Sequence, residues 1–306
     1  MQIGLLGLGR MGGNMARRLS RGGANVAVWN RNTVVSEQLA QEEQHIQACA
    51  TVEALVAELP APRIVWLMLP AGAATESVLQ TLRGLLSPGD LVVDGANAYY
   101  KESQRHAAEL EPLGFSFMDA GVSGGVWGLA NGYALMLGGS DAAMSRLAPF
   151  VRILAPAPDA GWLHCGPVGS GHFVKMVHNG IEYGMMQSLA EGMALMQAKE
   201  DFALDLAGIA EMWRHGSVVR SWILDLTTDF LRQNQKLDSI DPFVADSGEG
   251  RWTVLESVEQ GVPTPVMSLS LMMRFTSQGR NDYTNKLLAM MRKGFGGHGV
   301  KESGHD

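Results

Sequence analysis

Residues 169–184 hold four polar side chains whose types and spacing suit acid–base chemistry. They are an amine, an imidazole, an amide and a carboxylate, in this order: Lys175, His178, Asn179 and Glu182. If the segment is a helix, spacings of three, four and seven residues place all four on one face. Apolar neighbours predict that this helix is buried, namely Phe173, Met176, Val177 and Ile181. Because buried ionisable groups must be paired or used, the pattern indicates a functional site on this helix. A structural pair between Lys175 and Glu182 is the alternative.

A second pattern, at the start of the chain, indicates a dinucleotide cofactor. A short apolar run at residues 1–6 leads into Gly-x-Gly-x-x-Gly at residues 7–12 and then into a helix-like segment. In this fingerprint the first glycine allows a tight turn, the second lets a pyrophosphate approach the backbone, and the third lets the helix pack on the strand. The N-terminus of the helix then faces the phosphates. A second predicted strand, Asn25–Trp29, follows at the spacing that the fingerprint requires.

The end of that second strand bears on which nicotinamide nucleotide is used. An Asp or Glu there would accept a hydrogen bond from the ribose 2′-hydroxyl of NAD, but residues 30–33 include no acidic residue. Arg31 suits the 2′-phosphate of NADP, although a solvated surface arginine is the alternative. We therefore expect NADP, with NAD as the second choice. The expected cofactor contacts are Gly7, Leu8, Gly9, Arg10, Met11, Gly12, Asn30, Arg31, Asn32, Thr33, Leu69, Pro70 and Asn97.

Composition limits the class of protein. The chain has 306 residues, 46% hydrophobic and 18% charged, which suits a globular protein of two domains. A formal net charge of -7 argues against nucleic-acid binding, which usually needs a basic surface. Cys49 and Cys165 are too few for a disulfide framework, so a reducing cytoplasm is expected. The first strand begins at Gln2, which leaves no room for a signal peptide, and the longest apolar run, at residues 64–69, is too short to span a membrane.

The order of the predicted elements indicates two domains of different class. In residues 1–163, β-rich runs alternate with helical periodicity, which predicts a Rossmann-type doubly wound α/β sheet that binds NADP. The predicted strands are residues 3–6, 26–29, 64–69, 91–93, 115–118 and 133–137. Beyond Gly-Pro-Val at residues 166–168 no strand pattern recurs. Residues 164–306 are therefore expected to form an all-helical domain with a C-terminal tail.

Four separated motifs, at residues 7–12, 94–105, 122–128 and 169–184, match one family. Across residues 1 to about 298 the chain resembles the decarboxylating 6-phosphogluconate dehydrogenases in their short bacterial form. The first motif is shared with many nucleotide-binding proteins and the third with the wider β-hydroxyacid dehydrogenases. The second and fourth motifs are specific. The end of the chain also resembles the C-terminal tail that, in this family, reaches a neighbouring subunit.

The resemblance implies oxidative decarboxylation of 6-phosphogluconate to ribulose 5-phosphate and CO2, with reduction of NAD(P)+. Lys175 would be the general base that takes the proton of the substrate 3-hydroxyl as hydride leaves carbon 3. Glu182 would be the general acid that protonates carbon 1 of the enediol. A lysine with its ordinary pKa of about 10.4 is protonated at neutral pH, and burial beside apolar neighbours lowers such a pKa.

The same resemblance implies the substrate contacts and the assembly. Asn97 would lie where nicotinamide and substrate meet, and the turn at residues 123–125 would bind the substrate carboxylate. Tyr183 and arginines would hold the terminal phosphate, with Arg274 a rival to Arg280. The full set of expected contacts is Asn97, Ser123, Gly124, Gly125, His178, Asn179, Tyr183, Arg280, Arg292 and His298, the last two from a partner chain. The resemblance therefore implies a homodimer or homotetramer, with residues 164–306 as the substrate and dimerisation domain.

The chain also departs from the family's usual pattern. Where the longer relatives typically carry Lys-Gly-Thr-Gly-Lys-Trp, this chain has Ser247-Gly-Glu-Gly-Arg251-Trp252, so a phosphate-binding lysine of those relatives is replaced. Alanines replace the Gly and Ser usual around Asn97, and Val126 replaces a residue that is acidic in long forms. These changes affect substrate contacts and leave Lys175 and Glu182 in place.

Two other functions are alternatives. A β-hydroxyacid dehydrogenase or reductase of a small unphosphorylated acid, such as 3-hydroxyisobutyrate, would share the nucleotide motif and the helix lysine but would not need Glu182 or the tail. A noncatalytic NADP-binding sensor or scaffold would be expected to have lost the stripe of four polar residues, which is intact. Three further histidines are expected to have local structural partners: His164, His172 and His215. No metal site is predicted, because no cluster of His, Asp or Glu has the spacing of metal ligands.

Overall fold

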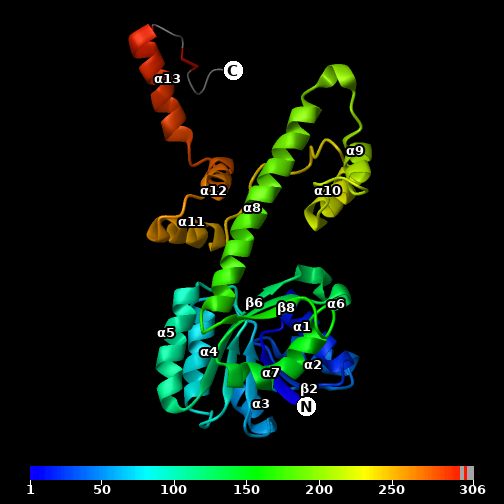
Figure 1. The fold of residues 1–306 in the computed structure, drawn as a ribbon, viewed down its shortest axis with the longest axis vertical. Helices are drawn as coiled ribbons and strands as arrows, with labels where there is room; N and C mark the ends of the chain where they lie inside the picture. The colour runs from blue at the N-terminus through cyan, green and yellow to red at the C-terminus, as the bar shows by residue number, and fades with distance from the viewer. Residues whose placement is uncertain (297–299, 302–306) are drawn as a thin grey trace. The chain divides into compact units, whose positions relative to one another are not determined.

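The computed structural model describes residues 1–296, 300 and 301. The chain divides into two compact units, Met1–Met176 and Val177–Asp306. The first unit is a sheet between layers of helices, and the described part of the second unit is helical (Figure 1). The predicted fold class is therefore confirmed. The division falls inside one long helix, α8 (Ser170–Gln197), and the boundary at residue 163 stays a prediction.

The first unit contains one eight-stranded sheet with the strand order β3-β2-β1-β4-β5-β6-β7-β8. Neighbouring strands are parallel except for β6 and β7, which pair antiparallel with Asp119 opposite Gly138 and Ser123 opposite Ala134. The strands are β1 (Gln2–Leu6), β2 (Asn25–Trp29), β3 (Ile46–Ala48), β4 (Ile64–Leu67), β5 (Leu91–Asp94), β6 (Ser116–Ser123), β7 (Ala134–Gly138) and β8 (Trp162–Gly166). The strand order changes direction between β1 and β4, which is where open α/β sheets bind their ligands.

All six predicted strands are present, and the two that sequence reasoning missed lie at the edges of the sheet. β3 has only three residues, and all five residues of β8 are half-buried or exposed. An edge strand buries less of its surface than a central one, so neither carries the apolar run that marks the central strands.

Helices cover both faces of the sheet (Figure 1). Strand β1 contributes to both layers, because Ile3 and Leu5 pack in one core cluster and Leu6 in the other. One layer contains α1 (Arg10–Arg21), α2 (Thr33–Glu42) and α7 (Asp141–Leu154). The other layer contains α3 (Val52–Glu58), α4 (Ala73–Arg83) and α5 (Tyr100–Leu110). Short helical turns complete the unit: η1 (Glu111–Leu113), η2 (Gly125–Trp127) and α6 (Gly128–Asn131).

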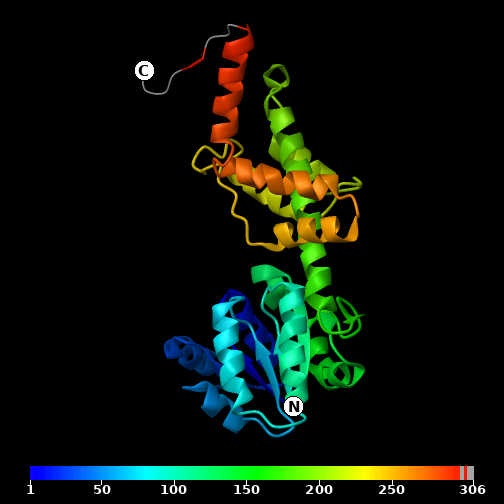
Figure 2. The same cartoon turned by 90° about the vertical axis from the view of Figure 1, so that its left-hand side faces the viewer.

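In the second unit, helices pack in pairs. The helices after α8 are η3 (Glu200–Phe202), α9 (Leu206–Trp213), α10 (Trp222–Gln233), α11 (Glu249–Gln260), α12 (Pro265–Ser277) and α13 (Asp282–Gly296). α9 packs on α10 (Figure 1), and α11 packs on α12 (Figure 2). Gly180 of α8 lies so close to Thr253 of α11 that an added Cβ would stand 2.7 Å from its methyl group. Among the described residues, no helix is both long and apolar enough to cross a membrane.

Candidate active site

The glycine-rich loop between β1 and α1 has the geometry that its sequence predicts. Gly7 has a φ of +97°, and a Cβ there would overlap the carbonyl of Met68. A Cβ at Gly12 would overlap the carbonyl of Gly7, so this glycine lets α1 pack against the end of β1. Nothing lies within 4 Å of the corresponding position at Gly9. The loop thus presents open backbone at its middle glycine and the N-terminus of α1 beside it, which fits a pyrophosphate.

A cavity of about 760 Å³ lies over this loop. Most of the expected cofactor contacts line it: Gly7, Gly9, Arg10, Met11, Gly12, Asn30, Arg31, Asn32, Leu69, Pro70 and Asn97. Leu8 and Thr33 lie outside this lining. The structure adds lining residues that sequence reasoning missed: Trp29, Met68, Ala74, Ser77, Val78, Gly95, Ala96 and Val122. The first turns of α4 and the loop after β5 supply several of these, and a nucleotide motif at the start of a chain gives no information about such distant segments.

In the segment after β2, two asparagines bond to the backbone, while an arginine lines the cavity. The Asn30 side chain accepts a hydrogen bond from the backbone N–H of Leu8 at 3.1 Å, which ties the end of β2 to the glycine loop. Asn32 caps α2 by accepting from the N–H of Val34 at 3.3 Å. Arg31 is exposed and lines the cavity beside the start of α2. A cation next to a helix N-terminus is suited to an anionic group.

β6 ends at the turn that was expected to bind a carboxylate. Gly124 and Gly125 have φ values of +137° and +52°, which residues with a Cβ rarely adopt. Ser123 is half-buried at the last position of β6, and its neighbour Val122 lines the cavity. The turn therefore lies at the rim of the cofactor cavity. Its role as a carboxylate site stays a prediction.

Lys175 is buried, with 9% of its surface exposed, and lies on α8 directly over β6. An added Cβ at Gly121 would overlap the Cβ of Lys175 and approach the carbonyl of Gly171 to 2.9 Å. The glycine in β6 thus lets the helix backbone come unusually close to the strand. This close approach fixes where the lysine side chain begins.

Further along α8, three of the four polar residues of the stripe are half-exposed. His178 Nδ1 lies 3.1 Å from Asn179 Oδ1 and 3.9 Å from Glu182 Oε2. The expectation that this helix is buried holds at Met176, which is 1% exposed, but is wrong at Ile181, which is 52% exposed. A helical spacing shows which side chains share a face, but what covers the opposite face depends on tertiary packing.

Tyr183 lies in a packed part of the second unit. The Arg274 guanidinium stacks 3.5 Å above the centre of the Tyr183 ring and donates to the carbonyl of Ala245 at 2.7 Å. Arg280 is exposed, and its guanidinium lies 5.6 Å from the ring of Phe275. The structure thus brings Arg274, the rival, against Tyr183.

Ser247, which stands where longer relatives carry a lysine, lies just before α11, and the C-terminal tail follows α13. Ser247 donates a hydrogen bond to Glu249 at 2.6 Å, and the Glu249 side chain is buried. Arg292 is an exposed residue of α13, and His298 lies outside the described residues.

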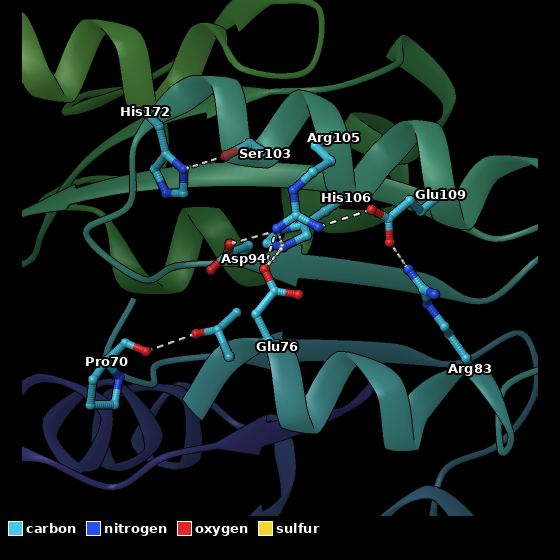
Figure 3. Close-up of polar contacts among 10 residues, drawn as sticks. Pro70, Glu76, Arg83, Asp94, Ser103, Arg105, His106, Glu109 and His172 are labelled. Carbon is cyan, nitrogen blue, oxygen red and sulfur yellow. Dashed lines mark hydrogen bonds and ion pairs between the residues drawn. The ribbon is translucent and has the colours of Figure 1, made fainter. Parts of the chain in front are cut away.

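A polar cluster that sequence reasoning did not anticipate lies between α4, α5 and β5 (Figure 3). Glu76 interacts with His106 Nε2 at 2.8 Å and with Arg105, and these bonds hold the pKa of its carboxyl below the ordinary value. Asp94 is fully buried, and burial raises its pKa. Its Oδ1 accepts from the N–H of Ala96 at 3.0 Å, which shapes the loop that carries Asn97 into the cavity.

The three histidines that were expected to have local partners do have them. His172 pairs with Ser103, His164 with the carbonyl of Gly139, and His215 with Glu211. In the part of the chain that the structure describes, no group of three or more His, Cys, Asp or Glu residues is arranged to hold a metal ion.

Comparison with protein families agrees with the two-part architecture. Residues 2–165 match the NAD binding domain of 6-phosphogluconate dehydrogenase, and residues 171–303 match the 6-phosphogluconate dehydrogenase C-terminal domain. The chain belongs to the 6-phosphogluconate dehydrogenase family.

Individual relatives agree along the chain. A decarboxylating, NAD+-dependent 6-phosphogluconate dehydrogenase of Haloferax volcanii is 38% identical and covers 98% of both chains. One of the same description from Bacillus subtilis is 35% identical over 90% of this chain, which spans 61% of that protein. Among solved structures, Plasmodium falciparum 6-phosphogluconate dehydrogenase, studied with NADP+ and with 6-phosphogluconate, aligns with a TM-score of 0.84 and 30% identity. That alignment covers 100% of this chain and 67% of the other.

Proposed function

We propose that this protein oxidises and decarboxylates 6-phosphogluconate to ribulose 5-phosphate and CO2 with reduction of NAD(P)+. The observation that carries the proposal is membership of the 6-phosphogluconate dehydrogenase family in both halves of the chain. The intact α8 residues Lys175 and Glu182 support it, because they supply a base and an acid two helical turns apart.

Lys175 is the proposed general base. Its amine takes the proton of the substrate 3-hydroxyl while hydride leaves carbon 3, and bound NAD(P)+ supplies the hydride acceptor. The resulting 3-keto acid loses CO2, and the electron pair of the broken bond moves to the carbonyl oxygen. The protonated Lys175 amine donates to that oxygen, so the same residue serves both steps.

Glu182 is the proposed general acid. After CO2 leaves, carbon 1 of the enediol needs a proton, and an acid on the same helix as Lys175 can address the other end of this short substrate segment. His178 lies 3.9 Å from the Glu182 carboxylate and 3.1 Å from the Asn179 side chain. His178 and Asn179 would orient the sugar hydroxyls.

The remaining substrate groups have candidate partners in each unit. In the first unit, Asn97 and the turn at residues 123–125 lie at or beside the cofactor cavity and would bind the nicotinamide side and the carboxylate. In the second unit, Tyr183 would contact the phosphate, with either Arg274 or Arg280 as the cation. Arg292 and His298 would complete that phosphate site from a partner subunit of a homodimer or homotetramer.

NADP is the proposed cofactor, with NAD as the alternative. Arg31 lines the cavity beside the N-terminus of α2, and residues 30–33 carry no carboxylate to hold the 2′-hydroxyl of NAD. Cys49 and Cys165 are both free thiols, which fits a reducing compartment such as the cytoplasm.

One assay tests the proposal. Reduced nicotinamide and released CO2 are followed together with 6-phosphogluconate or 3-hydroxyisobutyrate, each with NADP+ and with NAD+. Equal molar yields of both products from 6-phosphogluconate alone are expected. Turnover of 3-hydroxyisobutyrate without CO2 would favour the β-hydroxyacid dehydrogenase alternative, and no turnover of either acid would favour the noncatalytic one.

A further inference from the structure

One face of β6 carries three residues that matter for the position of Lys175. Side chains alternate along a strand, so Asp119, Gly121 and Ser123 share a face. Gly121 is the residue against which Lys175 packs, and Ser123 begins the turn at the rim of the cavity. Asp119 lies two residues before Gly121 and is 0% exposed.

The Asp119 carboxylate is bonded to the first turn of α8. Its Oδ1 accepts from the N–H of Gly169 at 2.6 Å, and its Oδ2 accepts from the N–H of His172 at 2.7 Å. Charge-assisted bonds of this length are among the stronger ones in proteins, and the positive end of the helix dipole adds to them. Lys175 follows His172 by three residues, on the same side of the helix and about 4.5 Å further along it.

Two glycines allow the backbone to pack closely around the Asp119 carboxylate. A Cβ at Gly138 would overlap Asp119 Oδ1, and one at Gly171 would overlap the carbonyl of Met136. Backbone therefore surrounds the carboxylate on several sides. Because both carboxylate oxygens bond to backbone N–H groups at the start of α8, the helix cannot slide along β6 without breaking these two bonds.

A second tie comes from α5. His172 Nδ1 lies 2.7 Å from the Ser103 hydroxyl in the buried interior, and Figure 3 shows the two side chains facing each other. The rings of Phe173 and Tyr100 also meet edge to face, 5.3 Å apart. The first turn of α8 is thus held by a strand on one side and by a helix on another.

We propose that Asp119, assisted by Ser103 through His172, is a positioning residue for the catalytic Lys175. The two ties, which we call the α8 clamp, fix the height of α8 on β6 and thereby hold the lysine amine at a set distance from substrate bound at the Ser123 turn. A shift of about 1 Å in such a group can cost on the order of a hundredfold in rate. The inference rests on the proposed function, because it needs Lys175 to act on a substrate.

Asp119→Asn tests the clamp, with Asp90→Asn as the matched control. Asp90 is also 0% exposed and also accepts two backbone N–H bonds, from Arg63 at 2.6 Å and Ser87 at 2.9 Å. Its ion pair, at 3.1 Å, is with the Arg63 guanidinium, so its partners lie outside α8. The asparagine at 119 keeps the size of the side chain but turns an NH2 group toward one of the two N–H donors. The measurements are thermal stability, NADP affinity, kcat and KM for 6-phosphogluconate, and the isotope effect with substrate deuterated at carbon 3.

The clamp predicts a loss of kcat that stability does not explain. Asp119→Asn should lower kcat by about 10- to 100-fold and raise the isotope effect, with NADP affinity within about twofold of wild type. Asp90→Asn should lower the melting temperature and leave kcat per folded enzyme unchanged. A kcat for Asp119→Asn that matches the control would overturn the proposal. Wild-type protein that fails to turn over 6-phosphogluconate would instead refute the proposed function.

Ser103→Ala keeps the test valid if Asp119→Asn does not fold. It removes the tie to the His172 ring without changing a buried charge. The clamp predicts a smaller fall in kcat, about three- to tenfold, again with unchanged NADP affinity. A kcat equal to that of wild type would remove Ser103 from the clamp and overturn the proposal as stated.

Discussion

At the scale of single residues, Lys175 and Glu182 differ in their surroundings. Lys175 is buried where α8 packs on β6, whereas the Glu182 side chain is 43% exposed and close to His178. A group held in packed structure has a fixed position, while a half-exposed carboxylate can exchange protons with solvent. These surroundings fit a base that acts on one bond and an acid that acts after CO2 has left.

Lys175→Met should lower the rate of hydride transfer by about 10²- to 10⁴-fold and leave NADP affinity nearly unchanged, because the amine is proposed to act on the substrate. Glu182→Gln should impair protonation of carbon 1 more than hydride transfer, which tritium exchange at that carbon measures. Glu191→Gln is the control, since Glu191 lies on α8 outside the stripe and pairs with Gln187. Equal impairment of single-turnover hydride transfer in the Lys175 and Glu182 variants would contradict this division of roles.

Arg31 is predicted to select NADP. Bonds to a charged group contribute about 1.5 to 3 kcal/mol, so Arg31→Ala should weaken NADP about ten- to a hundredfold and NAD little. Fluorescence titration with each nucleotide measures this. Arg21→Ala is a suitable control, because Arg21 pairs with Glu43 and does not line the cavity. Equal losses for NADP and NAD would show that Arg31 does not read the 2′-phosphate.

Asp94 should make stability depend on pH. Burial raises its pKa above the ordinary 3.8, so the folded protein holds this proton more tightly than the unfolded chain. The resulting stability is complete below about pH 3.8 and is lost as pH rises through the raised pKa. The free energy of unfolding of wild type minus that of Asp94→Asn should therefore fall with rising pH in urea titrations. A difference that grows with pH would mean that the ionised form is the one stabilised.

At the scale of elements, glycines have two different roles: one leaves space for a ligand, and the others allow a helix to pack closely on a strand. Gly9 leaves open space above the loop, while Gly12 and Gly121 are filled by neighbouring backbone or by Lys175. An open glycine receives a ligand, and a filled one lets two elements pack closely. Sequence alone predicted this difference for the loop, because the motif assigns each glycine its place.

Substitutions in the loop should separate these two purposes. Gly9→Ala meets no neighbour within 4 Å and keeps a φ of -62°, so it should leave the melting temperature unchanged and weaken NADP binding about tenfold or more. Gly12→Ala would overlap the Gly7 carbonyl and should lower both stability and NADP affinity. Calorimetry and nucleotide titration measure the two effects. Normal NADP affinity in Gly9→Ala would place the pyrophosphate elsewhere.

At the scale of the whole molecule, the second unit exposes many apolar side chains. In α13 alone, Tyr283 is 77% exposed, Met290 53% and Met291 51%, and Leu287 and Leu288 are also exposed. Such a surface is unusual for a helix that stays in water. It supports the proposal that the chain assembles with a second copy.

Removal of the chain after Met291 should raise the KM for 6-phosphogluconate about tenfold or more while the melting temperature and NADP affinity stay near wild type. The reason is that Arg292 and His298 are proposed to bind phosphate in a partner's site. The molar mass by light scattering reports whether the shortened protein still assembles.

Mixing Lys175→Met chains with shortened chains tests sharing between subunits. One site of a mixed dimer would combine an intact Lys175 with an intact partner tail. Activity above that of either variant is expected on mixing. No recovery, with mixed dimers shown to form, would rule out a shared site.

The sequence by itself determined the family, the glycine loop, six of the eight strands and the helical spacing of the α8 residues. Each of these depends on local pattern: a motif fixes backbone conformation, and a period of two or 3.6 residues fixes which side chains share a face. The family resemblance rested on four motifs that each lie within a short stretch of chain.

Only the tertiary structure decided which distant groups meet. It placed Asp119 under the first turn of α8, Arg274 rather than Arg280 on Tyr183, and Val122 and Ser77 in the cavity. It also left Ile181 exposed where the pattern predicted burial. These outcomes depend on how elements separated by tens of residues pack, and no local period contains that information, because one helix face can be covered by several different partners.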